Sequence, residues 1–192
     1  IGVIVCLGHS AADFEQSSQS FDQGVEMLTH SFNAMPGLHH RELGPIGAAI
    51  KNGGIFMGLI ADGIHLHPDM TVFMQKLAPS QLVLVSDALS PYGMKEGHYL
   101  WDGRDIFVKK GVCRLKDGTL AGVTLPLLDT CKRLAKWSGQ PSAAIWSATI
   151  APRHVFNKKT TEMNFFIGKS LKKLLRWHLN AQNRELSWQA AS

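Results

Sequence analysis

The sequence predicts an α/β fold arranged as the C-terminal half of a (β/α)8 barrel. Four apolar runs each lead into residues that can bind a metal or move a proton: VIVCLG before His9, VEML before Thr29 and His30, IFMGLIA before Asp62 and His65, and LVLV before Ser86 and Asp87. Parallel strands buried on both faces read as continuous apolar runs, and barrel enzymes carry their chemistry where such strands end. The third observation is length, because 192 residues fall short of the roughly 250 of a complete barrel.

The first residues suggest where the other half of the barrel would lie in the sequence. Ile1 is not an initiator methionine, and IGVIVCLG begins inside a strand-like run without a preceding turn. We therefore expect the chain to be the C-terminal part of a longer protein.

The elements of the predicted half-barrel alternate along the chain. A polar segment at 11–23 suits a short helix, and VEMLTH is the second strand. A loop rich in Gly, Pro and His leads into IGAAIKNG, whose small apolar residues suit a helix packed closely on a sheet. IFMGLIADGIHL is the third strand, MTVFMQKLA is a helix opened by His67-Pro68-Asp69, and QLVLVSDA is the fourth strand.

The remaining segments depart from this alternation. Alternating, turn-punctuated residues at about 94–122 predict a β insertion with hairpins at Asp102-Gly103 and Asp117-Gly118. Helical periodicity returns at 125–139 and stops at Gly139, and a helix that starts at Pro141 is expected to close at Pro152. In the tail, LLRWHL and ELSWQ flank a turn-like stretch and favour short strands.

Composition excludes several classes of protein. The net charge is +5, but residues 150–192 alone carry +6, so the basic excess avoids the strand ends and gives no reason to expect nucleic-acid binding. No apolar run approaches the roughly 18 residues of a membrane span. Cys6, Cys113 and Cys131 form no paired motif, and we expect them to be reduced and buried in a cytoplasmic protein.

His9 and His30 are the candidate metal ligands. Each one alone is more often a structural residue, but both follow apolar strands, and adjacent parallel strands about 4.8 Å apart can aim two imidazoles at one ion. Zinc or another divalent ion would also take a carboxylate and keep one position open for water. Because no carboxylate precedes His9 here, we expect that ligand on a preceding part of the protein.

Asp87 is the candidate proton carrier, although an Asp at a strand end can also simply cap a helix. A carboxylate beside a metal-activated water is the expected general base. His65 and His67 allow either a second metal pair, if the strand extends that far, or one substrate-facing His beside a helix-entry His; we favour the latter. His39, His40, His98, His154 and His178 receive no role.

The combination of five motifs resembles the N-acetylglucosamine-6-phosphate deacetylases of the amidohydrolase superfamily. The motifs are Gly8-His9-Ser10, Thr29 to Met35 (THSFNAM), Ala61 to His65 (ADGIH), Val85-Ser86-Asp87-Ala88 and Gly118 to Gly122 (GTLAG). The resemblance covers about residues 3–153. It implies a metal-dependent TIM barrel with a small β-sandwich domain. Residues 1–155 would then belong to the barrel, and 156–192 would be a remnant of the β domain.

The resemblance also implies a role for each matching residue. His9 and His30 would bind the metal, zinc first among ions that include iron, and Asp87 would be catalytic. His65 would contact the substrate. Asn33, Ala34 and Arg41 would meet the sugar phosphate, with Arg41 crossing between subunits of a homodimer, and Leu120, Ala121 and Gly122 would close on the N-acetyl group. The family's metal-binding glutamate has no counterpart in this sequence.

The implied reaction is hydrolysis of N-acetylglucosamine 6-phosphate to glucosamine 6-phosphate and acetate, in amino-sugar metabolism. Two other interpretations stay open. Another amidohydrolase, of the cyclic amidase or deaminase type, would share the His and Asp pattern at the strand ends. Alternatively, the chain is a non-catalytic piece that needs its other half.

Overall fold

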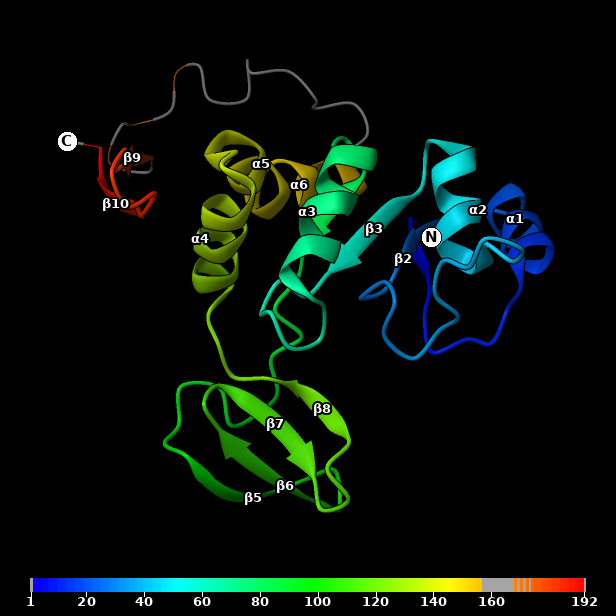
Figure 1. Cartoon of the computed structure of the whole chain (residues 1–192), viewed down its shortest axis with the longest axis horizontal. Helices are drawn as coiled ribbons and strands as arrows, with labels where there is room; N and C mark the ends of the chain where they lie inside the picture. The colour runs from blue at the N-terminus through cyan, green and yellow to red at the C-terminus, as the bar shows by residue number, and fades with distance from the viewer. Residues whose placement is uncertain (1, 157–167, 169, 171, 173, 192) are drawn as a thin grey trace.

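A computed structural model describes residues 2–156, 168, 170, 172 and 174–191. Helices gather around a parallel sheet, and a separate antiparallel sheet lies to one side of them (Figure 1). The β3 arrow points to the side on which the antiparallel sheet lies, so that sheet sits beyond the carboxyl ends of the parallel strands. Between residues 2 and 191, none of the described helices is both long and apolar enough to cross a bilayer.

The parallel sheet has the predicted strand–helix alternation. Its four strands pair in chain order, β1-β2-β3-β4, and every pairing is parallel. The elements are β1 (Val5–Leu7), α1 (Phe14–Asp22), β2 (Val25–Leu28), α2 (Gly44–Asn52), β3 (Phe56–Leu59), α3 (Pro68–Leu77) and β4 (Leu82–Leu84). The α/β class is therefore confirmed.

Local sequence signals account for where the helices begin and end. Asp13 and Gln16 form a capping box at the start of α1, in which Asp13 accepts from the Gln16 N–H at 2.8 Å and Gln16 accepts from the Asp13 N–H at 3.1 Å. His67 caps α3 ahead of Pro68, and α2 ends on Gly53 in the left-handed region.

Burial of the strands differs across the sheet. Buried positions alternate to both sides of each strand, at Met57, Gly58 and Leu59 in β3 and at Leu82, Val83 and Leu84 in β4, so both strands fit the expectation of being covered on both faces. That expectation is wrong for β1, where Val5 is 51% exposed. β1 is an edge strand, and α1 is the helix that follows it, so its apolar residues lack cover among the residues described.

The same edge position corrects one cysteine assignment. Cys113 and Cys131 are buried free thiols as expected, and burial raises the pKa of Cys131 to about 11. Cys6 is also free, but it is exposed because it lies on β1. The prediction of a buried thiol at this position is therefore wrong.

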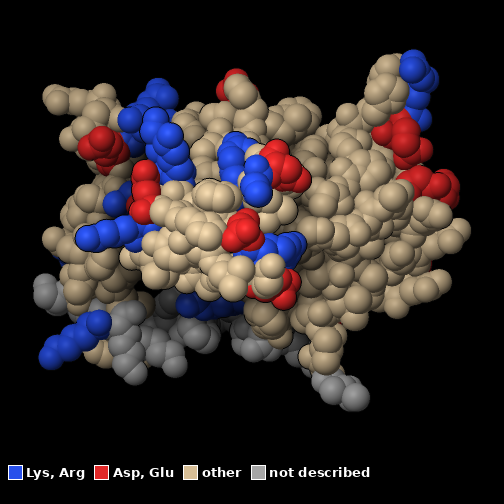
Figure 2. Space-filling view, turned by 90° about the horizontal axis from the view of Figure 1, so that it is seen from below, with Lys and Arg blue, Asp and Glu red and all other residues tan. Residues whose placement is uncertain are grey.

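The predicted β insertion is an antiparallel sheet of four strands in the order β5-β6-β7-β8. They are β5 (Gly97–Trp101), β6 (Arg104–Lys109), β7 (Val112–Leu115) and β8 (Leu120–Val123). Both expected hairpins are present, and a third turn at Lys110-Gly111 was missed. Seen from the side of this sheet, basic and acidic side chains lie interspersed (Figure 2), so this face carries no uniform basic patch.

β8 joins the antiparallel sheet to the end of β4. The Val123 N–H donates to the Asp87 carbonyl at 3.0 Å, and the Leu89 N–H donates to the Val123 carbonyl at 3.1 Å. Ala88 and Val123 form a parallel bridge. These bonds fix the backbone of 87–89 immediately after the last strand of the parallel sheet.

The remaining helices pack against one another and against β4. They are α4 (Leu127–Ser138), α5 (Pro141–Thr149) and α6 (Ala151–Phe156). The expectation that Pro152 closes the helix begun at Pro141 is wrong, because α5 ends at Thr149 and Pro152 lies in the first turn of α6. Proline is tolerated there, since the first N–H groups of a helix have no intrahelical partner.

The tail contains the two short strands expected from its sequence. β9 (Leu175–Leu179) and β10 (Leu186–Ala190) form an antiparallel hairpin, with Trp177 opposite Trp188. Most of the tail between α6 and β9, residues 157–167, lies outside the described residues.

The contact between β8 and Asp87 predicts a steric effect at Gly122. A Cβ added there would lie 2.9 Å from the Asp87 carbonyl oxygen and 2.8 Å from Leu89 Cγ. Gly118 also has a positive φ, but a Cβ there meets nothing within 4 Å. Gly122→Ala should therefore lower the free energy of unfolding by about 1–3 kcal/mol more than Gly118→Ala does.

Urea titration of both variants measures this difference. Equal losses in the free energy of unfolding would mean that strain at a positive φ accounts for both variants. They would contradict the close approach of Gly122 to the Asp87 carbonyl.

Candidate active site

The candidate residues follow the carboxyl ends of the four parallel strands. His9 lies two residues after β1, His30 two residues after β2, and Asp87 three residues after β4, while Asp62 and His65 occupy the turn after β3. Carboxyl ends of neighbouring parallel strands lie along one edge of a sheet. The sheet therefore brings this set to a common edge, as the sequence predicted.

The backbone at three of these positions is unusual. His9, His30 and Asp87 have φ values of 46°, 23° and 51°, in a region that residues other than glycine rarely adopt. Each such residue costs of order 1–3 kcal/mol, and such residues cluster at functional sites. The strain falls on the two candidate metal ligands and the candidate proton carrier, and the chain bends at His9 and His30.

His9 and His30 are brought together. Their Nε2 atoms lie 3.0 Å apart and their rings meet edge to face at 66°. Two imidazole nitrogens bound to one tetrahedral zinc ion at about 2.1 Å lie roughly 3.4 Å apart, so the observed pair fits two positions of such an ion with a small adjustment.

The surroundings of His30 fix its position. The Thr29 N–H donates to the Leu7 carbonyl at 2.9 Å, and the Ser31 N–H donates to the Gly58 carbonyl at 2.6 Å. His30 is therefore held between the strands on both sides. Its Nδ1 and the Ser31 hydroxyl are buried without a hydrogen-bond partner among the described residues, and each buried polar group of this kind costs about 1–3 kcal/mol.

A complete metal site is not formed by the described part of the chain. Within residues 2–156 and the described tail positions, no group of three or more His, Cys, Asp or Glu side chains could hold a metal ion. The donor chemistry of His9 and His30 thus fits a divalent ion, and a further ligand is needed to complete it.

Asp62 and His65 form a second, more deeply buried pair. The Asp62 Oδ2 lies 2.7 Å from the His65 Nδ1, and their side chains are 0% and 5% exposed. Burial alone would raise the pKa of Asp62, but hydrogen bonds from the His65 side chain and from the N–H groups of Ile64 and His65 outweigh it and lower that pKa. The sequence pointed to Asp62 only as one of the polar residues that follow the strands; its spacing of three residues from His65 was the signal for a pair.

The alternative of a second metal pair at His65 and His67 does not hold. β3 ends at Leu59, so strand alternation does not extend to these residues. His67 instead caps α3, accepting from the Asp69 N–H at 3.2 Å with a side chain that is 74% exposed. The expected helix-entry position of His67 is confirmed, and the expectation that His65 faces the substrate stays a prediction.

Asp87 is half-buried, and its main chain is bound to β8. It does not cap a helix, because the segment after it forms turns and leads into β5. Gly122 is buried beside Asp87, and Leu120 and Ala121 are half-buried on the same strand. The structure thus brings the predicted N-acetyl loop against Asp87, three residues after β4.

The predicted phosphate residues are only partly assembled. Ala34 lines a hollow of about 430 Å³ together with His9. The Asn33 side chain donates to the carbonyls of His30 and Ser31 at 3.2 and 3.3 Å, so it braces the turn that carries His30. Arg41 is exposed and contacts the neighbouring His40 at 2.6 Å, with no contact to Asn33 among the bonds of the described residues.

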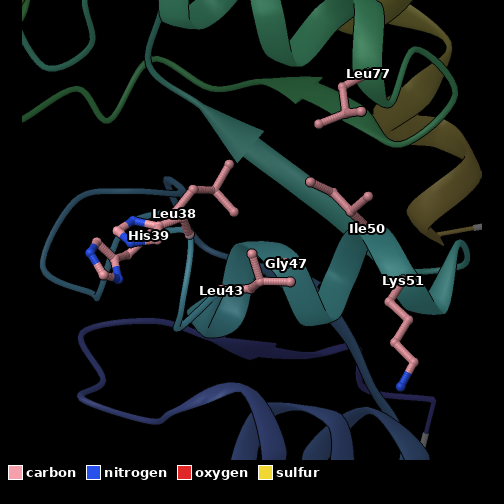
Figure 3. A pocket seen from close by; sticks show the side chains of 8 residues that line it. Leu38, His39, Leu43, Gly47, Ile50, Lys51 and Leu77 are labelled. Atoms are coloured by element: carbon pink, nitrogen blue, oxygen red, sulfur yellow. The ribbon is translucent and has the colours of Figure 1, made fainter.

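Another hollow lies away from the strand ends. Figure 3 shows Leu38, Leu43 and Ile50 around α2, with Leu77 of α3 across from them. Its lining is apolar apart from Lys51 and the loop residues His39 and His40, and none of the candidate catalytic or metal residues contributes to it. This hollow is therefore not a candidate for the metal binding and proton transfer expected at the strand ends.

Comparisons with known proteins give a consistent family. The chain is 38% identical over 151 residues to the N-acetylgalactosamine-6-phosphate deacetylase of Escherichia coli O157:H7, covering 78% of this chain and 40% of the relative. It is 37% identical over 145 residues to the N-acetylglucosamine-6-phosphate deacetylase of Vibrio furnissii, covering 76% and 36%. The chain thus spans less than half the length of these two relatives.

A shorter relative is covered more fully. The putative N-acetylgalactosamine-6-phosphate deacetylase of Escherichia coli K12 is 36% identical over 124 residues, which are 64% of this chain and 74% of that protein. No family model matches the sequence.

Solved structures agree with these relatives. The N-acetylglucosamine-6-phosphate deacetylase of Thermotoga maritima matches with a TM-score of 0.76 at 33% identity, covering 82% of this chain and 44% of that one. An aspartate-to-alanine mutant of the Mycobacterium smegmatis N-acetyl-D-glucosamine-6-phosphate deacetylase, in complex with N-acetyl-D-glucosamine-6-phosphate, matches with a TM-score of 0.78 at 29% identity, covering 81% and 43%. Together with the identities above, these matches mean that the chain belongs to the N-acetylglucosamine-6-phosphate deacetylase family.

Proposed function

We propose that the chain carries part of the active site of a metal-dependent deacetylase that converts N-acetylglucosamine 6-phosphate and water to glucosamine 6-phosphate and acetate. The observation that carries the proposal is the pair of Nε2 atoms of His9 and His30, 3.0 Å apart, at the end of a parallel sheet. The similarity to proteins named as sugar-phosphate deacetylases supports the substrate class.

His9 and His30 would hold the divalent ion, zinc first, with a carboxylate from another part of the protein as a further ligand. When bound, such an ion polarises a carbonyl oxygen and makes water acidic enough to lose a proton near neutral pH. The buried position of His30 between β1 and β3 keeps that donor fixed.

Asp87 is the proposed general base and acid. Its carboxylate takes a proton from the attacking water as the water oxygen adds to the acetamide carbon, and returns a proton to the nitrogen as the C–N bond breaks. His65 donates a hydrogen bond to the carbonyl oxygen as negative charge develops on it. β8 contributes by holding the Asp87 backbone, and Leu120, Ala121 and Gly122 would contact the N-acetyl group.

The sugar phosphate would bind on the His9 side of the sheet edge. Ala34 and Asn33 lie in the turn after His30, next to the hollow that His9 lines. Arg41 is exposed and its guanidinium can bind two phosphate oxygens at once, including those of a substrate on the other subunit of a homodimer.

A second candidate substrate is N-acetylgalactosamine 6-phosphate. Two of the relatives are named for that sugar, at 38% and 36% identity. Both sugars present the same acetamide and phosphate, so the residues assigned above would serve either one.

The proposal extends to the domains to which the two parts of the chain belong. The four parallel strands would form half of a TIM barrel within residues 1–155, and the β9–β10 hairpin within 156–192 would belong to a small β-sandwich domain. A cytoplasmic location would suit the substrate, which is a phosphorylated sugar.

Asp87→Asn tests the chemical role, in the purified protein that contains this chain with its metal bound. Deacetylation, measured as acetate release from either sugar phosphate, should fall by at least about 100-fold because the amide can neither take nor return the proton. Metal content should not change. Asp69→Asn, at an exposed side chain in the first turn of α3, is the matched control and should leave turnover intact. Retained turnover in Asp87→Asn would rule out the assigned role.

Arg41→Ala tests the phosphate contact in the same protein. The variant should raise KM for the phosphorylated sugar by about tenfold or more, since a charge-assisted pair contributes roughly 1.5–3 kcal/mol. Turnover of unphosphorylated N-acetylglucosamine should stay unchanged, and Arg104→Ala on β6 should affect neither substrate. An equal loss on both sugars would argue against a phosphate contact.

A further inference from the structure

The turn after β3 holds a buried carboxylate whose oxygens are all used. The Asp62 Oδ1 accepts from the N–H groups of Ile64 and His65, both at 2.8 Å, and the Oδ2 lies 2.7 Å from the His65 Nδ1. A buried carboxylate is costly unless it is hydrogen-bonded, and this one has three hydrogen-bond partners. Asp62 therefore organises the turn and the ring of His65 together.

The geometry fixes which nitrogen of His65 carries a proton. An ionised carboxylate can only accept, so the His65 Nδ1 must be the donor in the 2.7 Å contact. In the neutral ring the other nitrogen, Nε2, then has no proton, and in the charged ring it has one. No hydrogen bond joins Nε2 to another described residue, so it is the atom left for a ligand.

Helix α4 holds the same turn from outside. Arg133 donates from its guanidinium to the Asp62 carbonyl, across 71 residues of sequence. Trp137, one turn further along α4, lies where its ring would be 3.3 Å from a Cβ added to Gly63. The position of Asp62 is thus set by tertiary packing as well as by the turn.

We propose that Asp62 is a positioning residue for His65: its carboxylate orients the imidazole, keeps the proton on Nδ1 and presents Nε2 to the substrate carbonyl. This assignment rests on the proposed function only for the identity of the group that Nε2 faces, which is the substrate carbonyl. When the ring is charged, both nitrogens carry protons, and Nε2 can donate to the developing oxyanion while Nδ1 stays bound to Asp62.

A tautomer measurement tests the assignment without any turnover. In the ¹⁵N-labelled chain, the ring-nitrogen shifts of neutral His65 should report a proton on Nδ1. In Asp62→Asn the amide can donate to Nδ1 instead, so a substantial share of neutral His65 should shift its proton to Nε2. Asp69→Asn is the control, because Asp69 and His67 form an exposed pair 3.6 Å apart, and it should leave His65 unchanged.

Two results would overturn the proposal: a proton on Nε2 of neutral His65 in the unaltered chain, or an unchanged tautomer in a folded Asp62→Asn variant. If that variant does not fold, the measurement on the unaltered chain decides. Arg133→Met supplies the second variant; it keeps the carboxylate and should keep the Nδ1 tautomer.

Activity provides a separate readout in the protein that contains this chain. Asp62→Asn should reduce kcat by about 10- to 100-fold with little change in KM, less than expected for loss of the donor itself. In a His65→Ala background it should have little further effect, because the residue it positions is gone. Equal losses in both backgrounds would contradict positioning through His65. Absent deacetylation with the Nδ1 tautomer intact would instead reject the proposed function and leave the positioning role standing.

Discussion

Parallel pairing of β1 to β4 determines where the candidate site forms. It lines up four carboxyl ends at one edge, so that residues far apart in sequence become neighbours. The strands are short, three or four residues each, and the buried side chains of β3 and β4 form the centre of the core. The positive φ values of His9, His30 and Asp87 occur two or three residues after these strands stop.

Each candidate side chain is supported by a different neighbouring element. The segment around His30 hydrogen-bonds to β1 and β3, Asp87 is bound by β8 of the antiparallel sheet, and the turn of Asp62 is held by α4. Backbone strain of this kind persists only where the surrounding structure holds it in place. The antiparallel sheet thus acts as a structural support for the end of β4 as well as a proposed wall for the N-acetyl group.

The sequence predicted the alternating fold and the His9–His30 pair because both depend on regular features, namely apolar runs and their ends. It did not reveal the role of Asp62, since that role depends on how the turn folds back onto its own His65. It also missed the β8 contact with Asp87, which joins segments that no local pattern connects.

The errors have a similar origin. Cys6 looked buried because its strand is apolar, but exposure of an edge strand depends on what covers that edge. Pro152 looked like a helix terminator, yet it occupies the first turn of a new helix, where proline is equally acceptable. The local sequence allows Cys6 to be buried or exposed, and Pro152 to follow a helix or to begin one. Only the tertiary arrangement selects between these possibilities.

We propose that His9 and His30 bind one divalent ion through their Nε2 atoms. X-ray absorption spectroscopy of the zinc-loaded chain tests it most directly, with a His9→Ala/His30→Ala variant for comparison. We expect two imidazole nitrogens at about 2.0–2.1 Å from zinc in the chain and loss of that signal in the variant. Sulfur ligands at about 2.3 Å, or an unchanged imidazole signal in the variant, would contradict it.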